Sequence, residues 1–206
     1  MTDVTVIEAA SDDTIAVWLE QHLTRALNTT SGEVAIAVPG GSTPFPILAK
    51  LAGAALDWTR IAVWAGDDRM VAAEHEASNI GRIREVLKPS HARIVPLTPD
   101  ARPPHFALVW LGMGADGHIA SLFPNTDPRT DDPQRVRQLT PDPLPPEAPF
   151  DRITLTIPAL LDSDAIVFVV RGADKRVVFD AAVAGENDLP VARLLRAARQ
   201  PVTCFT

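Results

Sequence analysis

Short runs of wholly apolar residues recur along this chain, and each one leads into glycine or charged residues. The runs are Val34 to Val38, Ile61 to Ala65, Phe106 to Leu111 and Ala165 to Val170. An unbroken apolar run of this length is typical of a strand buried on both faces of a parallel sheet. Segments with apolar residues at spacings of three and four separate the runs, which is typical of amphipathic helices. The alternation predicts a single α/β domain over residues 1–206, with a mostly parallel open sheet and helices on both faces.

The composition is that of a globular protein, with 206 residues, 46% of them hydrophobic and 22% charged. The one cysteine, Cys204, excludes an internal disulfide and a cysteine-rich metal site, and its apolar neighbours predict a buried structural thiol. A formal net charge of -7 argues against nucleic acid and anionic membranes as partners, because both require basic surfaces. The first residues lack a secretory pattern, and no apolar run approaches the roughly 18 residues of a membrane span. We therefore expect a cytoplasmic protein.

Glycine, polar and charged residues gather directly after four of the predicted strands. The carboxyl ends of parallel strands lie at one edge of the sheet, where open α/β sheets bind their ligands. We therefore expect these four clusters to form one site. They are Gly40 to Thr43, Asp67 to Arg69, Asp116 to His118 and Arg171 to Lys175.

The first cluster lies in the segment Pro39-Gly40-Gly41-Ser42-Thr43-Pro44, which turns from a strand into a helix. Paired glycines let backbone N–H groups converge, Ser42 or Thr43 can cap the helix, and Pro44 fits the first turn. A helix start of this kind binds anions. An ordinary, well-capped turn would explain the same residues, but a cap does not require two glycines. We therefore favour phosphate binding at this turn.

Charged residues follow two other strands. Asp67 and Arg69 lie where α/β sheets place their ligands, and Asp68 is a weaker candidate. The alternative is an exposed loop in which the acids and the arginine pair with one another. Lys175 is expected in the first turn of a helix, where the helix dipole disfavours a cation. A residue that breaks a local rule often marks a functional site, whereas a solvated lysine is the simpler explanation.

The remaining cluster lies in Gly112-Met113-Gly114-Ala115-Asp116-Gly117-His118, which has the glycine spacing of a dinucleotide-binding loop. Such a loop continues into a long helix and a second strand. Here Pro124 limits any helix to about one turn, and the segment from Pro124 to Pro149 holds eight of the 19 prolines. We therefore interpret Asp116 and His118 as candidate functional residues and not as part of a nucleotide-binding loop. The proline-rich segment is expected to be a loop, and both a lid and a simple covering loop remain open.

Four motifs, in this order along the chain, resemble those of 6-phosphogluconolactonases. They are Pro39 to Pro44, Asp67 to Arg69 with Ser78-Asn79, Gly112 to Pro124, and Arg152 to Thr156 with Gly172 to Lys175. The third motif is long and specific, and the similarity covers almost the whole chain. The resemblance implies a Rossmann-like fold of the glucosamine-6-phosphate deaminase type. It also implies hydrolysis of 6-phosphoglucono-δ-lactone to 6-phosphogluconate in the oxidative pentose phosphate pathway, with no metal and no cofactor.

The resemblance further implies roles for the site residues, and these roles fit the chemistry of lactone opening. His118 would be the general base that activates water and returns the proton to the leaving alkoxide. Asp116 would orient the imidazole or the water. Asp67 matches an acid of the family and joins the catalytic set, with its role left open. The phosphate would be held by Gly40, Gly41, Ser42, Thr43, Arg69 and Lys175.

Other functions share parts of this pattern. A glucosamine-6-phosphate deaminase also has Asp-Gly-His and Gly-x-x-Lys, but its motif continues with Phe-Asn-Glu-Pro where this chain has Ser121 to Pro124. A non-catalytic sugar-phosphate sensor would need no general base and usually carries a DNA-binding segment. A metal hydrolase is disfavoured because Asp67, Asp116 and His118 lack a tight ligand spacing.

Small departures from the lactonase pattern bear on specificity more than on the reaction. Ile119 stands where lactonases usually carry threonine, and Asp68 replaces the usual glutamate. The segment from Pro124 to Pro149 is also differently composed. We expect a small sugar-phosphate lactone as the substrate, and the sequence leaves a monomer or a dimer open.

Overall fold

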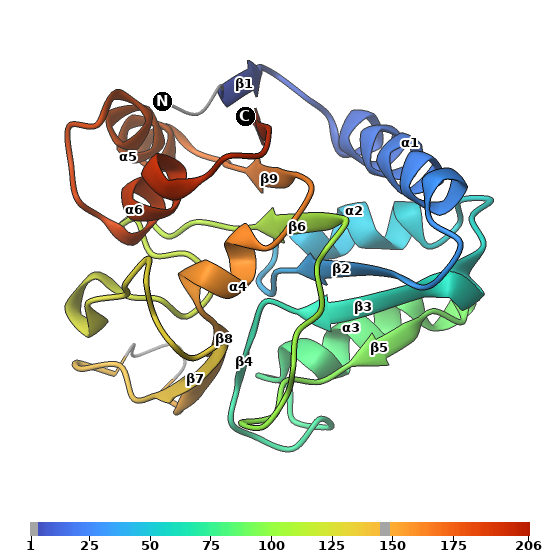
Figure 1. The fold of residues 1–206 in the computed structure, drawn as a ribbon, viewed down its shortest axis with the longest axis horizontal. Helices are drawn as coiled ribbons and strands as arrows, with labels where there is room; N and C mark the ends of the chain where they lie inside the picture. The colour runs from blue at the N-terminus through green and yellow to red at the C-terminus, as the bar shows by residue number, and fades with distance from the viewer. Residues whose placement is uncertain (1–3, 145–148) are drawn as a thin grey trace.

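Seven parallel strands form the central sheet, in the order β1, β10, β9, β6, β2, β3 and β5 (Figure 1). The computed structural model describes residues 4–144 and 149–206. Every residue of β2, β3, β6 and β9 is buried, so the four apolar runs are the inner strands, and the predicted mostly parallel α/β fold is confirmed. The strands are β1 (Val4–Ile7), β2 (Val34–Val38), β3 (Ile61–Ala65), β5 (Arg93–Val95), β6 (Leu108–Leu111), β9 (Ile166–Val169) and β10 (Val202–Phe205).

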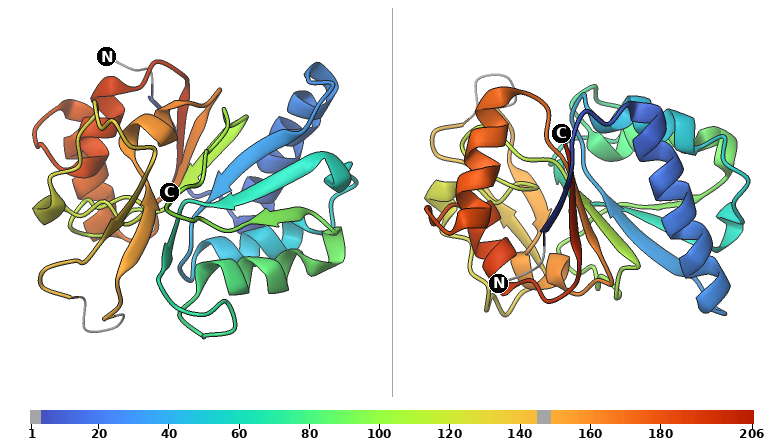
Figure 2. Two further views of the ribbon diagram at one scale, coloured as in Figure 1. Left: turned by 60° about the horizontal axis from the view of Figure 1, so that its bottom comes forward. Right: turned by 90° about the horizontal axis from the view of Figure 1, so that it is seen from above.

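Helices cover both faces of this sheet, which the view along its edge shows most clearly (Figure 2). On one face lie α1 (Asp12–Thr29), α2 (Pro44–Leu51) and α3 (Asn79–Leu87), and on the other α4 (Ile157–Leu161), α5 (Ala173–Ala184) and α6 (Pro190–Ala197). Alternate residues of a strand face opposite sides of a sheet, so Ile36 and Ala37 of β2 lie in different cores. No helix in the described part of the chain is long and apolar enough to cross a membrane.

The local sequence explains why α1 begins where it does and which side it buries. Ser11 is the N-cap, and its hydroxyl accepts a hydrogen bond from the Thr14 amide at 3.1 Å. Ile15, Leu19 and Leu23 recur at intervals of four and are fully buried against the sheet. Burying an aliphatic side chain of this size stabilises the fold by about 1.5–3 kcal/mol.

A second, antiparallel sheet was not expected from the sequence. Its strands are β4 (Asp67–Arg69), β8 (Arg152–Leu155) and β7 (Val136–Leu139), in that order. The alternation around Arg152 to Thr156 does form a strand, but β7 lies inside the segment that was expected to be a loop. β7 pairs with β8, the next strand along the chain, but β4 joins the same sheet from about 85 positions upstream, which no local pattern reveals. Residues 145–148 of that segment lie outside the described residues.

The glycine-rich segment after β6 does not continue into a helix. Within residues 112–123 the chain folds back on itself, with hydrogen bonds from the Gly117 amide to Gly114 O and from the Gly114 amide to His118 O, both of 3.0 Å. The next element is a single 3-10 turn, η3 (Pro124–Thr126). This course differs from that of a dinucleotide-binding unit, in agreement with the interpretation from sequence.

Candidate active site

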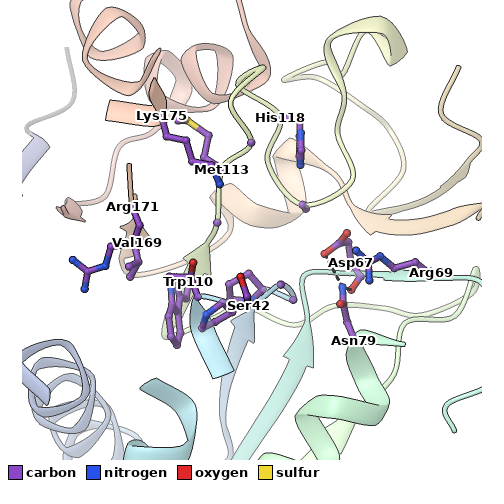
Figure 3. A pocket seen from close by; sticks show the side chains of 18 residues that line it. Ser42, Asp67, Arg69, Asn79, Trp110, Met113, His118, Val169, Arg171 and Lys175 are labelled. Carbon is purple, nitrogen blue, oxygen red and sulfur yellow. Dashed lines mark hydrogen bonds between the residues drawn. The ribbon is translucent and has the colours of Figure 1, made fainter. Parts of the chain in front are cut away.

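The four clusters predicted to meet do so in a cleft of about 270 Å³ at the carboxyl edge of the sheet (Figure 3). In Figure 3, Lys175 and Asp67 lie on opposite sides of the cleft, and His118 faces it from a loop. The site residues expected from the sequence that line the cleft are Gly40, Gly41, Ser42, Thr43, Asp67, Arg69, His118 and Lys175. Asp116 does not line it, and acts on the cleft only through His118.

A carboxylate holds the imidazole of His118 in place. Asp116 Oδ1 lies 2.6 Å from His118 Nδ1 and also accepts the His118 backbone N–H at 3.2 Å. The hydrogen bond from His118 lowers the pKa of Asp116, so the partner is an acceptor-only carboxylate at neutral pH. A carboxylate at Nδ1 places the imidazole proton there and leaves the Nε2 lone pair for an external proton. Chemically, an imidazole held in this way can accept a proton at Nε2.

Two glycines make this pair possible. A Cβ atom on Gly114 would lie 2.3 Å from the His118 ring and 2.5 Å from Asp116 Oδ1, so only glycine leaves room for both side chains. Gly117 has a φ of +77°, in the left-handed region that side chains rarely adopt. A Cβ atom there would also lie 2.7 Å from Leu189. The glycine spacing that suggested a nucleotide loop therefore serves the packing of Asp116 and His118.

An aromatic ring contacts the imidazole from the same loop. The ring centroids of Phe123 and His118 are 4.8 Å apart at an angle of 42°. Phe123 stands at the position where the deaminase motif described above carries glutamate. An apolar ring there gives the imidazole a packing contact and no second carboxylate.

Asp67 is buried at the wall of the cleft, where burial raises its pKa and the hydrogen bond from Ser121 opposes that shift. Ser121 Oγ donates to Asp67 Oδ2 at 2.5 Å. On the other side the Asn79 amide donates to Asp67 O at 3.0 Å and approaches Oδ1 at 3.4 Å. Asp67 is therefore held on two sides, with its carboxyl at the cleft (Figure 3).

Asp68 points away from the cleft and is a structural residue. Its carboxylate accepts the backbone amides of Asn79 at 2.6 Å and Ile80 at 3.1 Å, and the Ser78 hydroxyl at 3.2 Å. The two amides belong to the first turn of α3 and have no partner within the helix, so Asp68 anchors the start of that helix. From the sequence, Asp68 was a weaker candidate for the site than Asp67. It does not line the cleft, because alternate residues of a strand face opposite sides.

Arg69 lines the cleft but does not form an ion pair with either acid among the described residues. Its Nη1 donates to Ala77 O at 2.8 Å, and its Nε is buried without a partner in the described part of the chain. Burial and the charge of Arg69 together lower the pKa of the neighbouring Arg152. The alternative of an exposed loop with mutually paired charges is wrong, since both acids are buried.

The turn before α2 forms the floor of the cleft. A Cβ atom on Gly40 would lie 2.0 Å from Asn79 Oδ1, so this glycine lets the turn and α3 approach closely. Pro44 occupies the first turn of α2 as predicted, but the expected cap is absent from Thr43, whose side chain makes no cap hydrogen bond. Pro44 and Pro46 have no backbone N–H, so the donors left for an anion here are the Phe45 amide and the amides of the Gly40 to Thr43 turn.

Two cations from the β9 exit line the cleft. Lys175 lies in the first turn of α5, as predicted, and forms no ion pair within residues 4–144 and 149–206. Arg171 was part of the same cluster but has another partner. Its Nη2 donates to Ala10 O at 2.6 Å and lies 3.4 Å from Asp12 Oδ1, which ties it to the start of α1.

Comparison with known proteins places these features in a family. A family model described as glucosamine-6-phosphate isomerases/6-phosphogluconolactonase matches residues 8–104 and 90–203. The 6-phosphogluconolactonase of Mesorhizobium japonicum is 34% identical over 205 residues, covering 89% of this chain and 85% of that protein. The 6-phosphogluconolactonase of Pseudomonas putida is 35% identical over 211 residues, covering 90% and 86%. The chain belongs to this family.

A solved structure agrees with the family assignment. A 6-phosphogluconolactonase from Shewanella baltica superposes with a TM-score of 0.81 at 26% identity, covering 100% of this chain and 97% of that chain. The resemblance to the glucosamine-6-phosphate isomerase/6-phosphogluconolactonase family, inferred from four motifs, is thereby confirmed.

Three residues that contact Asp67 or His118 were given no individual role from the sequence. Asn79, Ser121 and Phe123 all lie inside the quoted motifs, and Ser121 to Pro124 was noted only as the segment that differs from the deaminase motif. Ser121 meets Asp67 across 54 positions of sequence, so no local periodicity shows that its hydroxyl turns inward.

Proposed function

We propose that this chain hydrolyses 6-phosphoglucono-δ-lactone to 6-phosphogluconate, a step of the oxidative pentose phosphate pathway in the cytoplasm. The observation that carries the proposal is the bond of 2.6 Å between Asp116 and His118 Nδ1, in a cleft that also presents Lys175 and the Gly40 to Thr43 turn. A base and an anion-binding region within one cleft suit a substrate that carries both a lactone and a phosphate. Membership in the family supports the same substrate.

The reaction follows from the free Nε2 of His118. Water loses a proton to Nε2 as its oxygen attacks the lactone carbonyl, which gives a tetrahedral oxyanion. The intermediate collapses, the bond between the carbonyl carbon and the ring oxygen breaks, and the imidazolium returns the proton to the departing alkoxide. Asp116 stabilises the imidazolium and keeps the ring oriented throughout.

The opposite part of the cleft would hold the phosphate. The helix-start amides near Ser42 and Thr43, with Lys175 and Arg69, supply donors and positive charge for it. Asp67, buried and held by Ser121, belongs to the catalytic set as an acceptor for substrate hydroxyls. In this proposal the loop after β6 carries the residues that catalyse hydrolysis, and the segments that follow the neighbouring strands bind the phosphate.

A side-by-side assay tests the reaction. Fresh 6-phosphogluconolactone is mixed with the enzyme and acid release is followed, with the spontaneous rate in buffer subtracted; glucosamine 6-phosphate is assayed in parallel for ammonia release. We expect rapid lactone opening and no ammonia. Lactone opening no faster than in buffer would refute the proposal, and ammonia release would favour a deaminase. Full activity after exhaustive chelation is expected, since no metal enters the proposed chemistry.

Two variants separate chemistry from grip. His118→Ala should lower kcat at least about a hundredfold with little change in KM, because a general base contributes that much to proton transfer. Lys175→Ala should mainly raise KM, by about ten- to a hundredfold, the value of a hydrogen bond to a charged group. Lys88→Ala, on the exposed surface away from the cleft, serves as the control. An unchanged kcat in His118→Ala would remove the assigned base.

A further inference from the structure

The start of α6 abuts the peptide bond that precedes His118. The Val191 amide lies in the first turn of α6, where N–H groups have no acceptor within the helix. It donates to Gly117 O at 3.2 Å. Leu189, the residue before the helix, packs so closely on Gly117 that no Cβ atom would fit. The upstream side of the His118 loop therefore rests on α6, beside which it lies in Figure 1.

Arg193, one turn further along α6, reaches the downstream side of the same loop. Its Nη1 lies 2.6 Å from Asp127 Oδ1 and donates to Pro128 O at 3.1 Å. Asp127 directly follows η3, which itself follows Phe123, the residue whose ring contacts His118. The guanidinium thus connects α6 to the segment that begins with that aromatic contact.

The other side of the guanidinium is anchored as well. Arg193 Nη2 lies 2.8 Å from Asp188 Oδ2, and Nε donates to the same oxygen at 3.0 Å. The Arg193 side chain is 25% exposed, whereas its partners Asp127 and Asp188 are 77% and 61% exposed, so the pairs matter for geometry more than for stability. The flat guanidinium spans two carboxylates at once, a geometry that lysine cannot reproduce.

We propose that Arg193 is a positioning residue for His118, which fixes the catalytic loop between α6 and the turn at Asp127. The proposal rests on the function proposed above. Arg193 contacts neither Lys175 nor the Gly40 to Thr43 turn among the described residues, so it governs the orientation of the base and leaves the phosphate grip unchanged. Small displacements of a base lower the rate of the chemical step while substrate affinity persists.

The test compares Arg193→Met with Arg196→Met. Arg196 lies on the same helix and also pairs with Asp188, but no hydrogen bond or ion pair joins it to residues 124–128 in the described part of the chain. Arg193→Met should lower kcat by roughly ten- to a hundredfold with KM within about twofold of wild type. Arg196→Met should retain wild-type kcat. Arg193→Lys should recover little, because only one of the two carboxylates can be reached.

A second readout is independent of turnover. In 15N-labelled protein, the His118 imidazole should show protonated Nδ1 in wild type and in Arg196→Met, and a mixture of tautomers in Arg193→Met. If the wild type does not open the lactone, the proposed function fails and this spectrum alone decides the role of Arg193. If Arg193→Met does not fold, Asp127→Gly replaces it: it removes the carboxylate that pairs with Arg193, leaves the bond to Pro128 O, and suits the positive φ of this position, and we expect kcat and the His118 spectrum to change in the same direction. Unchanged kcat and an unchanged His118 spectrum in the folded variant would overturn the proposal.

Discussion

Asp67 and Asp68 are identical side chains at adjacent positions, and the fold uses them for different purposes. Asp67 lines the cleft under a hydrogen bond from Ser121, whereas Asp68 accepts the first amides of α3. The difference arises because successive strand residues face opposite sides. Residue type and neighbourhood alone could not assign these roles, since both acids lie at the exit of the same buried strand.

At this scale Gly114 is the position that bears most directly on His118 and Asp116. In Gly114→Ala the new methyl group would start 2.3 Å from the His118 ring, so the pair of His118 and Asp116 must move apart or shift together. We expect kcat to fall about a hundredfold, measured in the lactone assay, with folding retained by circular dichroism. Gly66→Ala is the matched control, because its Cβ atom would lie 3.5 Å from the nearest atom, an ordinary contact. A Gly114→Ala enzyme with wild-type kcat would show that the close packing of this pair is not needed.

At the scale of elements, the loop entering β6 is tied to the turn between α4 and β9 by one histidine. His105 Nδ1 lies 2.7 Å from Asp162 and Nε2 lies 2.9 Å from Asp164. These two hydrogen bonds raise the pKa of His105. Asp162 also pairs with Arg135 at 2.6 Å, and arginine stays charged at any ordinary pH. The negative charge of Asp162 therefore keeps a partner when His105 is neutral.

This tie predicts a pH-dependent contribution to stability. A raised pKa means that the contribution is complete below the ordinary histidine pKa of about 6.5 and is lost as pH rises through the higher folded-state value. His105→Gln should therefore cost more at pH near 5.5 than near 8.5, by less than about 1 kcal/mol because the pairs are solvent-exposed. Urea unfolding at both pH values measures this. His91→Gln, at an exposed histidine with no ion pair among the described residues, should show no such difference. An equal cost at both pH values would contradict the assignment.

The second sheet shows how elements share the construction of the site. β4 carries Asp67, and β8 places Thr154 opposite it, where its hydroxyl accepts the Ser121 amide at 3.2 Å. Three segments far apart in sequence thus converge on one carboxyl. β4 and β8 are short, and their hydrogen-bonded pairing holds Asp67 against the loop that carries Ser121 and His118.

At the scale of the whole molecule, the accessibility of the Cys204 thiol measures how tightly the core is packed. It lies in β10, between β1 and β9, with no exposed surface, and burial raises its pKa to about 12. The prediction of a buried structural thiol is confirmed. Because the thiolate is the reactive form, the folded protein should not react with a thiol reagent near pH 8, and should react at one equivalent in denaturant.

The same thiol gives a stability signal at high pH. Its folded-state pKa exceeds the ordinary value of about 8.5, so its contribution is complete below that value and is lost as pH rises toward 12. In the labelling test near pH 8, rapid reaction of Cys204 in the folded protein would contradict the prediction, because it would mean that β10 opens far more often than the packed sheet implies.

The sequence by itself determined the strands of the central sheet, the edge at which the cleft lies and the residue proposed as the base, His118. Apolar periodicity, glycine spacing and the residues that follow each strand are local properties, and parallel topology converts them into one location. Family motifs then distinguished the chemistry of His118 from that of a nucleotide loop.

Only the tertiary structure decided which neighbouring side chains reach the cleft. The cap made by Asp68, the antiparallel sheet, the bond from Ser121 to Asp67 and the bridge through Arg193 all join positions that lie apart in the chain. Such contacts depend on where separate elements dock, and docking is set by the packing of the whole core. The sequence identified the chemical groups, and the packing of distant elements determined their orientation.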